Sequence, residues 1–164
     1  MAKVMILMGS VSDWESMRET AQVLATLGIP YEAHVASAHR TPERVRRLVT
    51  EGEAQGVQVF VAAAGMAAHL AGFVAAHTTK PVIGVPLPGG VADGLDALLS
   101  TAQMPGGIPV AAVAVGKAGA RNAAWLAAQI LALQDAQLAQ KIVQERQANA
   151  AKIAEADGQL TLGN

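Results

Sequence analysis

The side chains best suited to chemistry stand together in residues 36–42, which read Ala-Ser-Ala-His-Arg-Thr-Pro. Arg40 offers a planar guanidinium that can hold a phosphate through two hydrogen bonds. His39 carries the side chain that most readily exchanges protons near neutral pH, and Ser37 adds a hydroxyl. A lone loop histidine is more often a capping or surface residue, but the position of His39 between Ser37 and Arg40 favours a catalytic role.

A second candidate segment, residues 9–13, reads Gly-Ser-Val-Ser-Asp and follows an apolar run. The hydroxyl of Ser10 and the free amides of a helix N-terminus would form a cradle for a phosphate. Asp13 could then accept hydrogen bonds from sugar hydroxyls. An ordinary glycine turn with a serine cap explains the spacing equally well, because the segment lacks G-x-G-x-x-G and G-x-x-x-x-G-K-[ST].

A third segment, residues 64–72, is small and apolar around one histidine, His69. Its backbone, beginning at Gly65, could approach a planar ring closely and exclude water from a reactive intermediate. A histidine that caps the next helix is an equally good interpretation of His69. Residues 84–90 are interpreted as a stiff turn, and residues 103–109 as structural scaffolding.

Several other chemistries and partners are disfavoured by composition. The four histidines form no compact ligand pattern, so no metal is expected, and the chain has no cysteine and no G-x-S-x-G motif. Twelve basic and thirteen acidic residues give a net charge of -1, which argues against nucleic acid or an anionic membrane as a partner. No signal peptide or membrane-spanning stretch is recognised, and a cytoplasmic protein is expected.

Short apolar runs alternate with longer amphipathic stretches along most of the chain. The expected strands are residues 4–8, 31–35, 57–63, 82–85 and 110–115. The expected helices are residues 13–27, 42–55, 67–77, 93–101 and 119–134. Near-continuous hydrophobicity in the strands predicts a parallel sheet buried on both faces, in a doubly wound α/β sandwich. Ligands of such folds bind beyond the carboxyl ends of the strands, where all three segments above fall.

Helix boundaries carry local signals. Ser12 with Glu15 three residues later predicts a capping box, Thr41 precedes a proline at the first helical position, and Gly28 is expected to end the first helix. The arginines on the second helix are interpreted as a solvated basic face.

Residues 1–164 are expected to form a single domain, and no second domain or internal repeat is visible. Residues 135–164 are expected to add a charged C-terminal helix and tail that pack on neighbouring subunits. Aromatic residues make up only 3% of the chain, and the small apolar side chains leave flat surfaces that another subunit could cover.

Taken together, the segments resemble the 5-(carboxyamino)imidazole ribonucleotide mutase family over about residues 3–133. The resemblance is carried by five ordered segments, which are residues 8–13, 37–42, 67–70, 103–110 and 116–119 with Asn122. It implies a flavodoxin-like three-layer α/β/α sandwich with a central parallel sheet, assembled as a homo-octamer. It also implies conversion of an N-carboxylated aminoimidazole ribonucleotide into its C4-carboxylated isomer, without ATP, metal or organic cofactor.

The resemblance also implies roles for individual residues. His39 matches the catalytic histidine, which moves a proton while carbon dioxide is released and then recaptured. Ser10, Asp13 and Arg40 match substrate-binding positions, and Ser37 matches a position beside the phosphate. The third segment is expected to contribute Gly65, His69 and Leu70 to substrate binding.

The third segment departs from the family pattern, which usually reads Gly-Gly-Ala-Ala-His-Leu-Pro-Gly in mutases. Met66 replaces the second glycine, and Ala71 stands where proline is usual. The sister carboxylases, which use free carbon dioxide, carry Arg-Ser-Asn here and typically lysine after the catalytic histidine. Arg40 and residues 67–70 therefore side with the mutase. The alternatives are such a carboxylase and a non-catalytic flavodoxin-like nucleotide-binding module.

Overall fold

The computed structural model describes residues 1–161 of the 164-residue chain. The chain divides into two compact units, one spanning Met1–Ala127 and one that begins at Ala128. All of the strands and all of the candidate segments lie in the first unit. Among residues 1–161, no helix combines the length and the apolar character that a membrane span requires.

The order of elements follows the alternation read from the sequence. The strands are β1 (Val4–Met8), β2 (Tyr31–Val35), β3 (Val59–Ala64), β4 (Val82–Pro86) and β5 (Ala111–Ala112). The helices are α1 (Trp14–Leu27), α2 (Pro42–Ala54), α3 (Leu70–Ala75), α4 (Leu95–Ala102), α5 (Gly116–Ala132) and α6 (Ala136–Thr161). Two short 3-10 turns, η1 (Val11–Asp13) and η2 (Val91–Asp93), precede α1 and α4.

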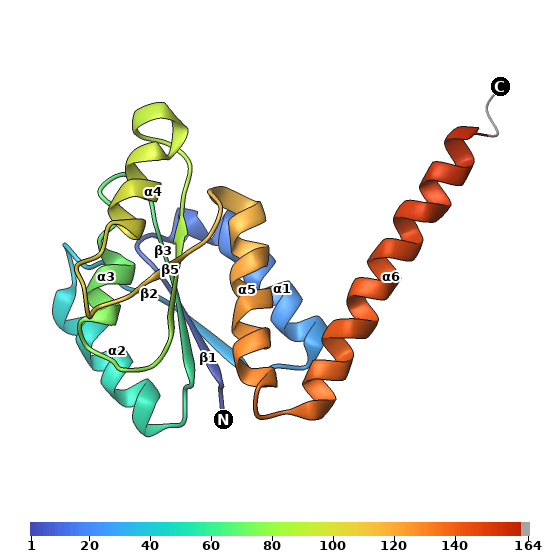
Figure 1. Cartoon of the computed structure of the whole chain (residues 1–164). Helices are drawn as coiled ribbons and strands as arrows, with labels where there is room; N and C mark the ends of the chain where they lie inside the picture. Colours follow the sequence, from blue (N-terminus) through green and yellow to red (C-terminus); the bar gives the residue numbers. More distant parts are fainter. Residues whose placement is uncertain (162–164) are drawn as a thin grey trace. The chain divides into compact units, whose positions relative to one another are not determined.

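Helices cover both faces of the sheet within the first unit. In Figure 1, α2, α3 and α4 lie on one side of the strands, whereas α1 and the first part of α5 lie on the other. The hydroxyl of Thr20 in α1 donates a 2.7 Å hydrogen bond to the Ala120 carbonyl of α5, which ties this layer together. The three-layer α/β/α arrangement expected from the resemblance is therefore confirmed.

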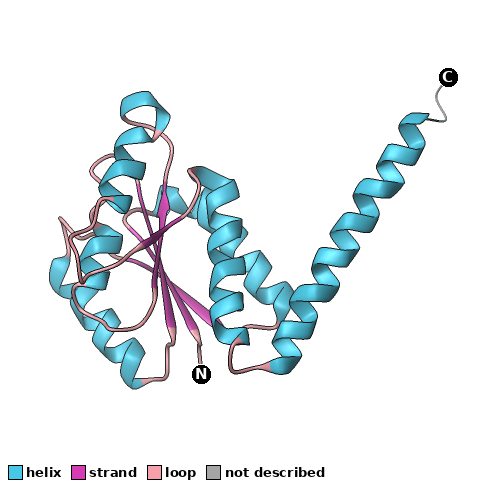
Figure 2. Cartoon of the chain, in the orientation of Figure 1, coloured by secondary structure: helices cyan, strands magenta, loops and turns pink. Residues whose placement is uncertain are grey.

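All five strands pair in parallel, in the order β2-β1-β3-β4-β5. Figure 2 shows these strands in magenta, with helices in cyan on either side of them. This is the flavodoxin-like strand order. The chain leaves β1 in one direction to form β2 and later returns on its other side as β3. The loops after β1 and β3 therefore diverge at their carboxyl ends, and that crevice is where such folds bind ligands.

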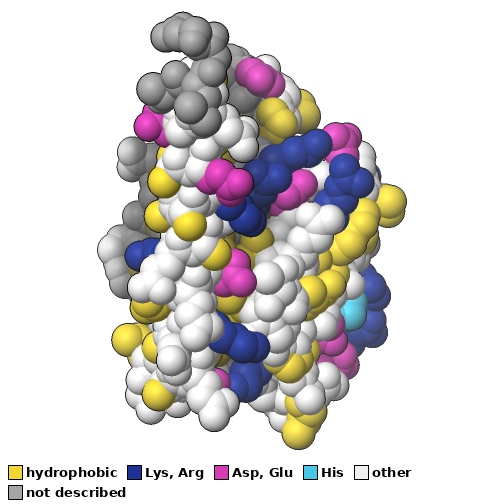
Figure 3. Space-filling view, turned by 90° about the vertical axis from the view of Figure 1, so that its right-hand side faces the viewer, with side chains coloured by type: hydrophobic (Ala, Val, Ile, Leu, Met, Phe, Trp, Pro, Cys, Tyr) yellow, Lys and Arg dark blue, Asp and Glu magenta, His cyan; other side chains and the backbone are white. Residues whose placement is uncertain are grey.

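Charges of both signs are mixed on the surface. Figure 3 shows lysine and arginine side chains lying next to acidic ones on the face drawn. In the first unit, Lys117 pairs with Glu15 at 2.9 Å and Arg121 pairs with Glu19 at 2.7 Å. Such pairs near the surface contribute little to stability, but they place opposite charges next to one another where α1 meets the start of α5.

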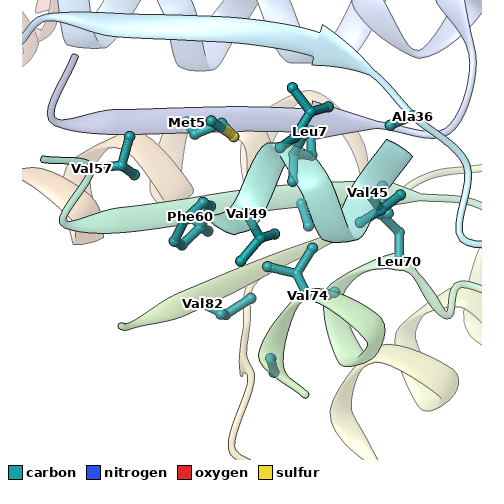
Figure 4. Close-up of a cluster of buried hydrophobic side chains, with 14 residues drawn as sticks. Met5, Leu7, Ala36, Val45, Val49, Val57, Phe60, Leu70, Val74 and Val82 are labelled. Carbon is teal, nitrogen blue, oxygen red and sulfur yellow. The ribbon is translucent and has the colours of Figure 1, made fainter. Parts of the chain in front are cut away.

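A hydrophobic cluster fills the space between the sheet and helices α2 and α3 (Figure 4). Phe60 of β3 is fully buried and belongs to this cluster together with Val49 of α2 and Val74 of α3. Leu70 belongs to the same cluster and is only 2% exposed. Because protein interiors are closely packed, this cluster fixes where α3 begins relative to the end of β3.

The expected burial of every strand on both faces is wrong for the two edges of the sheet. β1 and β4 are buried along their whole length, but β2 alternates between exposed and partly buried residues. The expected fifth strand, residues 110–115, shortens to Ala111–Ala112, and both residues are exposed. Edge strands have a neighbour on only one side, so part of their surface stays open in a single chain.

The predicted start of the first helix is also wrong in detail. The capping box joins Ser10 and Asp13 ahead of η1 rather than Ser12 and Glu15, because η1 inserts a tighter turn before α1 begins. Gly28 ends α1 as expected, with the left-handed φ of 73° that glycine adopts without a Cβ clash.

Later helix boundaries shift by a few residues. The third helix begins at Leu70 rather than residue 67, and α5 begins at Gly116 rather than residue 119. The C-terminal helix is confirmed, and it runs from Ala136 to Thr161. Residues 162–164 of the expected tail lie outside the described part of the chain.

Candidate active site

The loops after the first four strands line one cavity of about 460 Å³ at the carboxyl edge of the sheet. All eight residues proposed from the sequence line it, namely Ser10, Asp13, Ser37, His39, Arg40, Gly65, His69 and Leu70. The cavity is large enough for a small ligand such as a mononucleotide. The segment after β5, residues 116–119, does not contribute to its lining.

The loop after β1 is shaped by reciprocal hydrogen bonds. The Ser10 amide donates to the Asp13 carboxylate at 2.9 Å, and the Ser12 amide donates to the Ser10 hydroxyl at 3.4 Å. The two serine hydroxyls lie 3.0 Å apart. Ser10 therefore holds its hydroxyl at the start of the turn, beside the amides that favour an anion.

Arg40 connects the loop after β2 to the loop after β1. Its Nη2 donates a 2.9 Å hydrogen bond to the Gly9 carbonyl, and its own amide donates to the Ser37 hydroxyl at 3.2 Å. The Arg40 side chain lines the main cavity and also a neighbouring hollow of about 590 Å³. A guanidinium anchored in this way is preorganised to meet a phosphate.

Thr41 precedes α2 as expected, but its hydroxyl does not cap the helix. Instead, it accepts a hydrogen bond from the Ser37 amide at 2.9 Å, and the Thr41 amide donates to the Ser37 carbonyl at 2.9 Å. The threonine thus closes the turn that presents His39 and Arg40, while proline begins α2.

Two histidines from different loops meet in the cavity. Nε2 of His39 lies 2.7 Å from Nδ1 of His69, and their rings are nearly perpendicular at 87°. Because one nitrogen must donate and the other accept, a single proton can be shared between the rings. His69 is the N-cap residue that immediately precedes α3, yet its side chain makes no capping hydrogen bond, so the capping interpretation of this histidine is wrong.

Asp13 is partly buried beneath the cavity. Burial raises the pKa of its carboxyl above the ordinary value of 3.8, while the Ser10 and Gly9 amides and the Arg40 charge offset part of this rise. Desolvation therefore outweighs the groups that favour the ionised form. A bound sugar would supply hydroxyl donors to the same carboxylate.

We expect the Asp13 carboxyl to make protein stability fall slightly as pH rises from 3.8 upward. The folded protein holds this proton more tightly than the unfolded chain, so raising the pH favours unfolding. Denaturant titrations between pH 3 and 7 measure the free energy of unfolding. This free energy should fall more with rising pH in the wild type than in Asp13→Asn. A pH-independent difference between the two proteins would contradict the assignment.

Sequence reasoning missed one wall of the cavity. Leu87, Pro88, Gly89 and Gly90 follow β4 and line the cavity, although the segment was interpreted only as a stiff turn. The sequence signal for this wall is that residues 87–90 directly follow an expected strand, since ligands of such folds bind at the carboxyl ends of the strands. Arg44 is likewise more than part of a solvated face, because its Nε donates to the Val35 carbonyl at 3.0 Å.

Comparison with known proteins identifies the family of the chain. The AIR carboxylase family matches residues 3–152 of the chain. The chain belongs to this family. Within residues 1–161, no group of three or more histidine, aspartate and glutamate side chains is arranged to hold a metal ion.

Relatives in the family carry a more specific name. The N5-carboxyaminoimidazole ribonucleotide mutase of Saccharolobus solfataricus is 54% identical over 142 residues, covering 87% of this chain and 89% of that protein. The protein of the same name from Bacillus subtilis is 48% identical, with 94% and 96% coverage. The crystal structure of Treponema denticola PurE superposes with a TM-score of 0.86 at 37% identity, covering 96% of this chain and 97% of that one.

Proposed function

We propose that this protein is an isomerase that converts the N-carboxylated aminoimidazole ribonucleotide, here called the carboxyamino ribonucleotide, into its C4-carboxylated isomer in purine biosynthesis. One observation carries the proposal: a single cavity combines an anion cradle with a pair of histidines in contact. The names of the relatives support the mutase reaction over the alternatives.

Substrate binding is divided among the loops. Ser10, Ser37 and Arg40 hold the phosphate, and Asp13 accepts hydrogen bonds from the ribose. Gly65 lets the backbone approach the flat ring, with Leu70 beneath it. Anchoring the phosphate orients the ring, so binding energy from an unreactive part of the substrate lowers the barrier of the chemical step.

The chemistry requires only the movement of a carboxyl group and a proton. The N–carboxyl bond breaks to release carbon dioxide, and its electron pair stays on the nitrogen, which takes a proton. The ring carbon C4 then forms a bond to the same carbon dioxide and loses its hydrogen. His39 is the group that moves the proton, and its 2.7 Å contact with His69 keeps its ring oriented in the cavity.

Turnover of the purified protein tests this function. With the carboxyamino ribonucleotide alone, and without ATP, we expect formation of the C4-carboxylated isomer, followed by its absorbance and by mass spectrometry. Binding of the ribonucleotide with no turnover would instead support the non-catalytic nucleotide-binding module.

We further propose that residues 1–164 act as one mutase domain, assembled as a homo-octamer in the cytoplasm. Exposed apolar side chains support assembly: Leu95 and Leu99 of α4 are 46% and 49% exposed, and the edge strand β5 is open. Residues 135–164 are proposed to pack on neighbouring subunits. The cytoplasm is proposed because a phosphorylated sugar does not cross a membrane unaided.

The molar mass in solution provides the test of assembly. We expect light scattering to give about eight times the 16.8 kDa chain mass at micromolar concentration. A stable monomer with full activity would contradict the assembly.

A further inference from the structure

Met66 occupies a backbone conformation that side chains rarely adopt. Its φ is 55°, in the left-handed region that favours glycine. The residue lines the cavity and is 65% exposed, so its side chain gains little from burial in the core. Protein stability therefore does not explain why a long side chain stands at this position.

The backbone around Met66 is held from both sides. The Ala68 amide donates a 3.0 Å hydrogen bond to the Ser100 hydroxyl of α4. On the other side, the Leu87 amide donates to the Ala64 carbonyl at 3.0 Å. Because these contacts fix the loop, any residue at position 66 must accept the left-handed conformation, and its side chain must start at the same point on the cavity wall.

Part of the cavity lining is apolar, although polar and charged side chains line the rest. Ala64, Ala67, Leu87 and Pro88 line the same cavity as Met66. Methionine adds a flexible, unbranched apolar chain that adapts to the shape of a neighbouring ligand. Carbon dioxide is small, uncharged and without a hydrogen-bond donor, so an apolar cover that excludes water holds it without a directed bond.

We propose that the Met66 side chain retains the released carbon dioxide in the cavity until the ring carbon captures it. This inference rests on the proposed function, in which the N–carboxyl bond breaks before the new carbon–carbon bond forms. Met66 takes no part in breaking the N–carboxyl bond or in forming the carbon–carbon bond. It determines the fraction of carbon dioxide that is recaptured rather than lost to water.

Isotope retention measures that fraction. The carboxyamino ribonucleotide, labelled with ¹³C in its carboxyl group, is converted in buffer containing unlabelled bicarbonate and carbonic anhydrase. Wild type should keep most of the label in the C4 carboxylate. In Met66→Gly, the ratio of lost to retained label should rise about tenfold, the scale of an altered apolar contact in a binding pocket.

Two further variants separate retention from backbone strain. Met66→Gln keeps the chain length and the strained conformation but adds a polar amide, and should lose label as Met66→Gly does. Ala92→Gly relieves a similar left-handed φ of 46° at a residue that does not line the cavity, and should keep label like wild type. Glycine should raise the melting temperature at both positions, so a folding defect is not expected.

Label retention equal to wild type in both Met66 variants would overturn the inference, with the proposed function intact. Loss of all label by the wild type, with product still formed, would also overturn it. Absence of any C4-carboxylated product from the wild type would overturn the proposed function and this inference together.

Discussion

Replacing His39 with asparagine is expected to lower kcat by about 10²–10⁴-fold, the usual contribution of a positioned general acid–base group. Asparagine keeps a polar side chain of moderate size but cannot exchange a proton near neutral pH. The phosphate cradle of Ser10 and Arg40 is untouched, so ribonucleotide binding should stay close to wild type. Steady-state kinetics and calorimetric binding measure the two quantities separately.

His77→Asn provides the matched control. Nδ1 of His77 contacts the Phe73 carbonyl at 2.7 Å, and the residue does not line the cavity. Its substitution should change kcat by no more than about twofold, as expected for a surface position. An undiminished kcat in His39→Asn would refute the role of that histidine, whereas equal losses in both variants would point to a general loss of structure.

Replacing Arg40 with alanine is expected to raise KM by about 10- to 100-fold, the cost of losing hydrogen bonds to a charged group. The variant loses the guanidinium and also its 2.9 Å hydrogen bond to the Gly9 carbonyl, which joins the loop after β2 to the loop after β1. Inorganic phosphate should compete with substrate in the wild type and much less in the variant. Initial rates at varied phosphate concentration give both constants.

Arg46→Ala removes the same charge from the adjoining helix. Arg46 pairs with Glu43 at 2.8 Å on the exposed face of α2 and lies outside the main cavity. Its KM should stay within about twofold of wild type. A rise in KM as large as that of Arg40→Ala would mean that the overall field of α2, rather than a direct phosphate contact, controls binding.

Local patterns predicted most of the fold because each strand and helix has its own periodicity. β1 and β3 read as apolar runs because they are buried on both faces, and Gly28 marks the end of α1 through its left-handed φ. The edge strands of the sheet are harder to predict from sequence. The apolar residues 110–115 predict a strand, but only Ala111–Ala112 form one, and both are exposed.

The site was predicted as a set of loops, but its contacts required the tertiary structure. His39 and His69 lie thirty positions apart, and only the pairing of β1 with both β2 and β3 brings them to 2.7 Å. The wrong prediction of the capping box has a local cause, because two overlapping residue pairs compete to form it. Ser12 with Glu15 and Ser10 with Asp13 both match a capping pattern, and the second forms because η1 precedes α1.

The backbone conformation of Met66 and the position of the loop after β4 depend on tertiary contacts that local sequence patterns do not predict. Methionine itself gives no sign of the φ of 55° at position 66, and the one sequence signal is that the family pattern has glycine there. That conformation follows from distant contacts such as Ser100 with the Ala68 amide. Likewise, the glycines at 89 and 90 look like an ordinary turn until the sheet places them on the cavity wall.

The most direct test of the mutase function compares two substrates under identical conditions. Purified protein receives either the carboxyamino ribonucleotide, or the unmodified aminoimidazole ribonucleotide with bicarbonate, and kcat/KM is measured for formation of the C4-carboxylated product. We expect efficient turnover of the carboxyamino ribonucleotide and far weaker turnover of the unmodified one. Turnover of the unmodified ribonucleotide with bicarbonate, and none of the carboxyamino ribonucleotide, would contradict the mutase function and establish a carboxylase.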